Sequence, residues 1–173
     1  KTHKRSERVV KEAIRLEALT NDLLDFAKTG QPNRERIDPA SLVQEAADAV
    51  SLGGIRIDSA AAPDRWPLDP LRMRQVLENV LRNAVQATPD GAQPPQATIS
   101  VGRSGLVIEV ADTGAGIADA DLAAIFEPFH TQRTRGTGLG LAVSRRIVEQ
   151  HGGTISAANR TGGGAVFRME IPA

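Results

Sequence analysis

The chain has 173 residues, with 21 basic and 21 acidic side chains and therefore no formal net charge. This length fits one ordinary domain plus an appendage, and the balanced charge excludes a global positive field that would attract nucleic acid or an anionic membrane. Apolar residues make up 40% of the chain, aromatic residues 3%, and cysteine is absent, so we expect an aliphatic core and exclude disulfides and thiolate chemistry. No apolar run approaches the roughly 20 residues that span a bilayer, and we expect a soluble segment without a signal peptide.

The first predicted element is a long helix over residues 5–28, which contain neither glycine nor proline. Apolar and small side chains recur in it at alternating spacings of four and three, the pattern of a heptad seam. The seam consists of Val9, Ala13, Leu16, Thr20, Leu23 and Ala27, and the wider apolar stripe adds Leu19, Leu24 and Phe26. We expect another helix, not evident in this sequence, to cover this face. Gly30 and Pro32 end the helix and mark a domain boundary.

After this boundary, helical and strand patterns alternate, which is typical of a layered α/β domain. Asp38-Pro39 and Asp69-Pro70 each place an N-cap before a proline at the first helical position. They predict helices over residues 39–50 and 71–87, and a third helix is predicted over residues 139–150. Strands are predicted over residues 55–57, 97–101, 106–110, 154–158 and 165–171, with the second and third forming a hairpin. Pro67 and Pro70 restrict the extended segment around them to a sheet edge.

Two asparagines, Asn79 and Asn83, lie four residues apart on the helix 71–87 and therefore project from the same face. An amide oxygen there is a neutral ligand suited to Mg²⁺, which takes its other ligands from water and substrate phosphates. Alternatively, such a pair bonds to neighbouring backbone in a structural role, and an isolated pair favours that interpretation.

A second motif, Asp112-Thr113-Gly114-Ala115-Gly116, follows the predicted strand 106–110. A carboxylate at a strand end can accept a hydrogen bond from an exocyclic amine, and the glycines let the backbone pass close to a flat ring. The same residues alone would also make an ordinary turn.

A third motif, Gly136-Thr137-Gly138-Leu139-Gly140, opens the predicted helix 139–150. Exposed amides at a helix N-terminus form an anion site. The motif is neither a Walker P-loop, because no Lys-Ser or Lys-Thr follows, nor a Rossmann fingerprint, because no strand precedes it.

Between these motifs lies the segment 126–135, whose two aromatic residues, Phe126 and Phe129, we expect at the surface. A polar and basic run follows them and ends in glycine, which suits a mobile flap over an anionic ligand. Arg133 and Arg135 would then contact phosphate. A solvated loop is the alternative.

The order of these four motifs resembles the catalytic ATP-binding domain of sensor histidine kinases, within the superfamily that includes gyrase, Hsp90 and MutL. Residues 75–84 resemble the N box of that family, residues 112–116 its first glycine box, residues 126–129 its F box and residues 136–140 its second glycine box. The resemblance covers residues 34–173. Residues 1–30 are similar to the second helix of the dimerisation hairpin of the family.

This resemblance implies a two-layer α/β sandwich with a mixed sheet, the Bergerat or GHKL-type ATPase fold, preceded by a long helix. ATP would lie between the helices and the flap, with Asp112 accepting the adenine amine and Asn83 ligating Mg²⁺. The residues expected to bind the nucleotide are Asn79, Arg82, Asn83, Asp112, Gly114, Gly116, Ile117, Phe129, Arg133, Arg135, Thr137, Gly138, Leu139 and Gly140.

The reaction implied by the resemblance is transfer of the γ-phosphoryl group of ATP to a histidine, followed by relay to a response regulator. The partners implied are that regulator and a second copy joined through the helical hairpin, in a cytoplasmic segment of a bacterial protein, membrane-anchored or not. No catalytic residue is assigned, because His3 lacks the acid and proline that follow the acceptor histidine of the family. His130 is interpreted as a flap residue and His151 as a favourable partner of a helix dipole.

Gln86 departs from the lysine frequent at its position in the family, so arginines would have to compensate the phosphate charge. Two other functions remain open. One is nucleotide binding without transfer, as in a pseudokinase or a fragment. The other is the serine kinase or ATPase branch, whose hydrolases carry a catalytic glutamate where this chain has Asn79.

Overall fold

The computed structural model describes residues 30–50, 54–131 and 137–173, and six separate helical positions before them, Val10, Ala13, Leu16, Thr20, Leu23 and Leu24. In these residues the elements follow one another as β1 (Glu35–Ile37), α2 (Pro39–Val50), β2 (Arg56–Asp58), β3 (Trp66–Leu68), α3 (Pro70–Ala87), β4 (Gln96–Gly102), β5 (Gly105–Ala111), α4 (Asp119–Leu122), α5 (Gly140–Gln150), β6 (Thr154–Asn159) and β7 (Ala165–Ile171).

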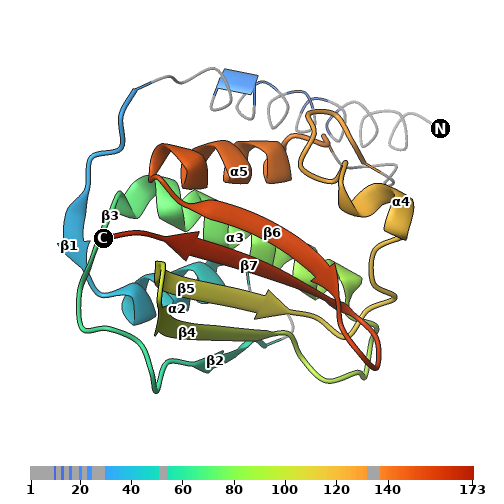
Figure 1. Cartoon of the computed structure of the whole chain (residues 1–173). Helices are drawn as coiled ribbons and strands as arrows, with labels where there is room; N and C mark the ends of the chain where they lie inside the picture. Colours follow the sequence, from blue (N-terminus) through green and yellow to red (C-terminus); the bar gives the residue numbers. More distant parts are fainter. Residues whose placement is uncertain are drawn as a thin grey trace.

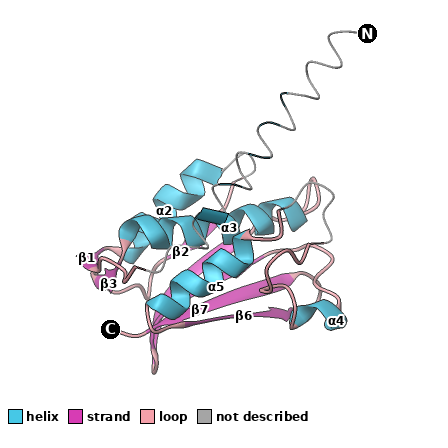
Figure 2. Cartoon of the chain, turned by 90° about the horizontal axis from the view of Figure 1, so that it is seen from above, coloured by secondary structure: helices cyan, strands magenta, loops and turns pink. Residues whose placement is uncertain are grey.

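Five strands form one mixed sheet in the order β2-β4-β5-β7-β6. The pair β2–β4 is parallel, and the other neighbouring pairs are antiparallel. Helices α2, α3 and α5 lie together on one face of this sheet (Figures 1 and 2). The predicted two-layer α/β sandwich with a mixed sheet is therefore confirmed.

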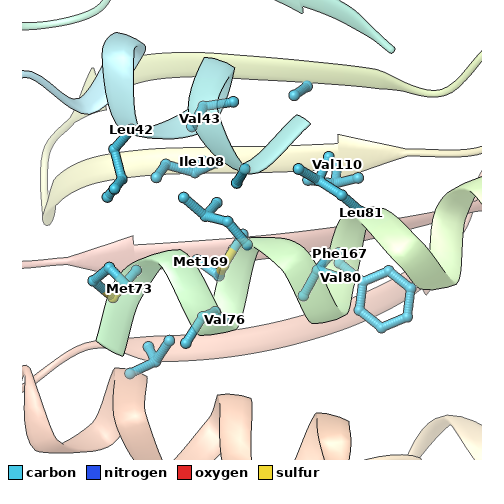
Figure 3. Close-up of a cluster of buried hydrophobic side chains, with 14 of the residues drawn as sticks. Leu42, Val43, Met73, Val76, Val80, Leu81, Ile108, Val110, Phe167 and Met169 are labelled. Atoms are coloured by element: carbon cyan, nitrogen blue, oxygen red, sulfur yellow. The ribbon is translucent and has the colours of Figure 1, made fainter. Parts of the chain in front are cut away.

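The core lies between α3 and the sheet (Figure 3). Apolar residues recur on one face of the helix and on one face of the strands, and these two faces pack together. Strand β7 alternates strictly between buried and partly exposed residues, so its inward side chains, such as Phe167 and Met169, face the helices. Helix α3 begins at its N-cap Asp69, whose Oδ1 accepts a hydrogen bond from Arg72 N at 3.0 Å. Its buried side is formed by Met73, Val76, Leu77, Val80, Leu81 and Ala84. Each large side chain buried there contributes about 1.5–3 kcal/mol of transfer free energy, which fixes the angular position of α3.

The predicted hairpin is confirmed, because β4 and β5 pair from Gln96↔Ala111 to Gly102↔Gly105. The Pro67 segment is also an edge piece as predicted, since the one strand that β3 pairs with in the described part of the chain is the short strand β1. The sequence did not predict β1 or α4. No helix among the described residues has both the length and the apolar character needed to cross a membrane.

The described positions of the predicted heptad seam are all exposed, namely Ala13, Leu16, Thr20 and Leu23. Leu16 is 62% exposed and Leu23 50%. The Thr20 hydroxyl donates a hydrogen bond to Leu16 O at 2.8 Å, one helical turn back. Val9 and Ala27, the remaining seam positions, lie outside the described residues.

Candidate functional site

A cavity of about 510 Å³ opens where α3, the loop after β5, α4 and the start of α5 meet. Its volume is within the range of roughly 300–1,000 Å³ that is usual for small-ligand sites. The predicted binding residues that line it are Asn79, Arg82, Asn83, Asp112, Gly116, Ile117, Thr137, Gly138 and Gly140. Three motifs that are far apart in the sequence therefore meet at one cavity.

Asp112 lies just beyond the C-terminal end of β5 and is only 2% exposed. Its Oδ1 accepts hydrogen bonds from Gly114 N at 2.8 Å and Ala165 N at 3.2 Å. Both bonds fall on the same oxygen, and no donor among the described residues is bonded to Oδ2. The fold thus holds the carboxylate rigidly by one oxygen and leaves the other for a ligand with an N–H group.

Gly114 does not line the cavity, although the sequence predicted it as a binding residue. A Cβ at this position would lie 2.4 Å from Ala87 O at the end of α3. The glycine is therefore needed for close packing of the Asp112 loop against the helix that carries Asn83.

Asn79 lines the cavity, but its side-chain amide also has a structural partner. Its Nδ2 donates to Gly140 O at 3.1 Å and lies 3.5 Å from Ser144 Oγ, which in turn donates to Gly140 O at 2.8 Å. Ser144 is fully buried. This group joins the middle of α3 to the first turn of α5, so Asn79 has the structural role that was one of the two alternatives for the asparagine pair. Asn83, one turn further along α3, also lines the cavity.

Gly138 of the second glycine box contacts Phe129 of the F box. Gly138 has a φ of +71°, and a Cβ there would lie 2.6 Å from the carbonyl carbon of Phe129. Phe129 N donates a hydrogen bond to Gly138 O at 2.9 Å. Phe129 has a positive φ of 65° and a side chain that is largely exposed, 63% for the residue, and it does not line the cavity.

Leu139 also lies outside the lining residues. Its side chain is fully buried, and its N–H group donates to Thr137 Oγ1 at 3.3 Å. The residue therefore anchors the start of α5 in the core. Arg133 and Arg135, predicted as phosphate contacts, lie outside the described residues.

The prediction that Phe126 lies at the surface is wrong. Phe126 is only 8% exposed and packs edge to face on Phe167, with ring centroids 6.3 Å apart and planes at 85°. The short helix α4, which no sequence signal predicted, lies just before Phe126 in the chain. The aromatic ring thus belongs to the core beside the cavity.

Several lining residues were not predicted as site residues: Gln86, Ala87, Ala118, Asp121, Ile125, His130, Thr131, Leu141, Ala165 and Phe167. Among them, His130 Nε2 lies 3.2 Å from Asp121 Oδ1, which connects the flap to α4. Ala165 and Phe167 come from β7, which pairs directly with β5. Among these residues, only His130 had a signal in the sequence, because it directly follows the F box. Ala165 and Phe167 had none, because the pairing of β7 with β5 is not marked by a sequence motif.

His151 is the C-cap of α5, the position from which the sequence interpreted it as a partner of the helix dipole. It is fully buried, and its Nε2 accepts a hydrogen bond from Asp69 N at 3.0 Å, while Nδ1 lies 2.8 Å from Ile147 O. This arrangement requires a neutral ring with its proton on Nδ1. Burial lowers the pKa of His151 below its usual 6.5, which also favours the neutral form.

A metal in this cavity would need a bound phosphate to supply some of its ligands. The described part of the chain contains no group of three or more histidine, cysteine, aspartate or glutamate side chains that could hold a metal. The amide of Asn83 together with phosphate oxygens and water is a donor set that Mg²⁺ accepts. The donors present at the cavity therefore fit Mg²⁺ carried with a nucleotide.

Two solved structures share this fold over most of the chain. ShkA, full-length and in complex with AMPPNP, superposes with a TM-score of 0.81 and 32% sequence identity, covering 99% of this chain and 39% of that chain. The nucleotide-free catalytic domain of the histidine kinase ThkA gives a TM-score of 0.72 and 29% identity, covering 81% and 95%. The sheet, the helix layer and the cavity thus define a domain with the histidine kinase ATPase fold.

Residues 68–173 match the sequence profile described as histidine kinase-, DNA gyrase B-, and HSP90-like ATPase, and the chain belongs to this family. The sensor histidine kinase ZraS of Escherichia coli K12 is 36% identical over 176 residues, covering 98% of this chain and 38% of ZraS. The sensor protein FixL of Bradyrhizobium diazoefficiens is 32% identical over 178 residues, covering 96% of this chain and 35% of FixL. The chain thus spans little more than a third of these curated relatives.

Proposed function

We propose that this chain is the ATP-binding catalytic part of a two-component sensor histidine kinase, which transfers the γ-phosphoryl group of ATP to a histidine for relay to a response regulator. The observation that carries the proposal is the meeting of Asp112, Asn83 and the start of α5 at one cavity. The similarity to ZraS, FixL and the AMPPNP-bound ShkA supports it.

In this proposal each wall of the cavity has a distinct task. Asp112 accepts a hydrogen bond from the adenine amine, and Ile117 and Gly116 lie beside the base. Gly138 and Gly140 place backbone at the phosphates, where the first turn of α5 favours negative charge. Phosphoryl transfer depends mainly on such positioning and charge stabilisation. Mg²⁺, held by Asn83 and the phosphates, would supply the countercharge.

We further propose that residues 1–30 form the second helix of a dimerisation hairpin and residues 34–173 the ATP-binding domain. The exposed seam at Ala13, Leu16, Thr20 and Leu23 supports this division, because an apolar face of that kind is expected to pack on other helices. The intact protein would then be a homodimer. The bacterial relatives favour a cytoplasmic place for this segment.

The acceptor histidine would be none of the histidines of this chain and would lie on another segment. His151 is buried and bonded through both ring nitrogens. His130 faces Asp121 within the cavity, and His3, which lacks the acceptor motif, lies outside the described residues. Between the two alternative functions, the ATPase branch is disfavoured because Asn79 occupies the position of its catalytic glutamate. Binding without transfer has to be separated by assay.

The deciding experiment combines this chain with a separate helical hairpin that carries a complete acceptor motif, in the presence of Mg²⁺ and γ-labelled ATP. We expect label on the acceptor histidine, lost in Asn83→Ala and kept in the control Asn33→Ala, whose side chain bonds to Glu35 away from the cavity. Calorimetry with AMPPNP distinguishes the two failures. Binding without label would indicate a nucleotide-binding module, and absence of both would refute the proposed function.

A further inference from the structure

The turn between β6 and β7, residues 160–164, packs against the loop that carries Asp112. Asn159, the last residue of β6, holds this loop through its side chain. Its Oδ1 accepts from Ile117 N at 2.8 Å, and its Nδ2 donates to Ile117 O at 2.7 Å. A carboxamide offers one acceptor and one donor side by side, so Asn159 satisfies both backbone groups of a residue 42 positions away.

Arg160 adds a second link from the same turn. Its Nη1 donates to Asp112 O at 2.7 Å. Asp112 N donates to Ala165 O at 2.9 Å, and Ala165 N donates to Asp112 Oδ1 at 3.2 Å. The backbone of Asp112 is thus bonded to residues at both ends of this turn, and its carboxylate is bonded to Ala165 at one of them.

The turn and the Asp112 loop also approach each other so closely that two positions require glycine. Gly164 has a φ of +84°, and a Cβ there would lie 2.0 Å from Asp112 O. At Gly116, with a φ of +79°, a Cβ would lie 2.8 Å from Asn159 Oδ1. This contact is therefore specified from both sides, by glycine in the turn and by glycine in the loop.

Neither Asn159 nor Arg160 lines the cavity. We infer that both are positioning residues for nucleotide binding, which hold residues 112–117 in the conformation that receives the purine. The inference rests on the proposed function and deepens it. If the loop is fixed before binding, the ligand does not have to order it, and the affinity rises by the ordering cost that is avoided.

The effect should fall on the base and not on the phosphates, because the phosphate side of the cavity is held separately by Asn79, Gly140 and Ser144. We expect Asn159→Ala to weaken binding of adenosine and of AMPPNP by about tenfold, since each lost hydrogen bond corresponds to a factor of about 2 to 12. Binding of magnesium tripolyphosphate should stay unchanged. Arg160→Ala should act in the same direction, by about threefold.

The test is isothermal titration calorimetry of the full chain with these three probes, together with amide hydrogen exchange at Ile117. The matched controls are Asn33→Ala and Arg65→Ala, since Arg65 donates to the Arg36 carbonyl at 3.0 Å far from the loop. Asn159→Asp keeps the acceptor for Ile117 N but places a carboxylate oxygen against Ile117 O, so it should weaken adenosine binding at least as much as Asn159→Ala. Urea unfolding of both variants guards against a misfolded alanine variant. Faster exchange at Ile117 with selective loss of adenosine supports the inference.

Two results would overturn it. The first is a wild-type chain that binds AMPPNP and an Asn159→Ala variant that binds adenosine as tightly as the wild type does. The two residues then do not position the loop, while the proposed function stands. If all three probes weaken equally, the role of Asn159 is general stability. A wild-type chain that binds no AMPPNP would instead refute the proposed function and, with it, this inference.

Discussion

Replacing Asp112 with asparagine exchanges one hydrogen-bond acceptor, a carboxylate oxygen, for a donor, an NH₂ group, and hardly changes the shape of the side chain. In the structure, Oδ1 already accepts hydrogen bonds from Gly114 N and Ala165 N. The amide oxygen of an asparagine would keep these two bonds, so its NH₂ group would take the place of Oδ2. Asp112→Asn therefore leaves the loop in place and presents a donor where a purine amine requires an acceptor.

The magnitude follows from the bonds that are kept and lost. A hydrogen bond to a charged acceptor contributes about 1.5–3 kcal/mol, so AMPPNP should bind about 10- to 150-fold more weakly. The free energy of unfolding should fall by only about 1 kcal/mol, because both backbone bonds remain without charge assistance. Asp112→Ala leaves both backbone N–H groups unpaired and should cost about 2–6 kcal/mol of stability.

The assay is calorimetry with ATP analogues that differ only in the base. We expect Asp112→Asn to shift preference towards inosine nucleotides, because their 6-oxo group accepts a hydrogen bond from the new amide. The control is Asp58→Asn, because Asp58 is exposed at the end of β2 and its carboxylate accepts a hydrogen bond from Ala60 N. Unchanged AMPPNP affinity in Asp112→Asn, or equal losses for both bases, would refute the assignment of Asp112 to the purine.

Three further variants test other parts of the site. Ser144→Ala should weaken AMPPNP binding by about threefold and leave adenosine binding unchanged, because the contacts between α3 and the start of α5 lose one hydrogen bond. Calorimetry checks both values, and the control Ser41→Ala, at a distant helix start, should change neither. Gly138→Ala should weaken AMPPNP binding at least tenfold, because its Cβ would meet flap backbone at 2.6 Å, whereas Gly91→Ala, with a φ of +78° and open space, should cost only the left-handed strain of about 1–2 kcal/mol in urea unfolding. For His151, burial lowers the folded pKa below the unfolded value, so the unfolded chain binds the proton first and the free energy of unfolding falls as the pH drops through about 6.5. Urea unfolding between pH 7.5 and 5.5 should show a slope of at most about 1.4 kcal/mol per pH unit, reduced in His151→Gln; equal slopes would exclude the buried ring as the cause.

The sequence predicted those parts of the fold that depend on local signals. Asp69 and Pro70 mark the start of α3, and the apolar residues that follow fix which face of the helix is buried. The strand predicted over residues 165–171 has the extent of β7, and its pairing with β6 was also predicted. Asp112 and Asn83 were predicted from the order of the motifs and the family resemblance that it carries, and both line the cavity.

The remaining features depend on contacts between distant segments and have no local signal. Strand β1 is three residues long and exists through its pairing with β3. Phe126 lies next to a polar flap in the sequence but meets Phe167 in space. Asn159 resembles any residue at the start of a turn, and only the structure shows that its amide is bonded to Ile117.

Both ends of α5 are bonded to α3, which explains how one helix layer can hold the two sides of the cavity in a fixed relative position. Near the cavity, Asn79 of α3 donates to Gly140 at the start of α5. At the opposite end, His151 after α5 accepts from Asp69 N at the start of α3. Arg72 then donates both to Gln150 Oε1 at 2.6 Å and to Gly30 O at 2.9 Å. Gly30, at which the lead-in meets the domain, is thus bonded to α3 through Arg72, and Arg72 is itself bonded to the end of α5. A displacement of one helix relative to the other would have to break polar contacts at both ends of α5.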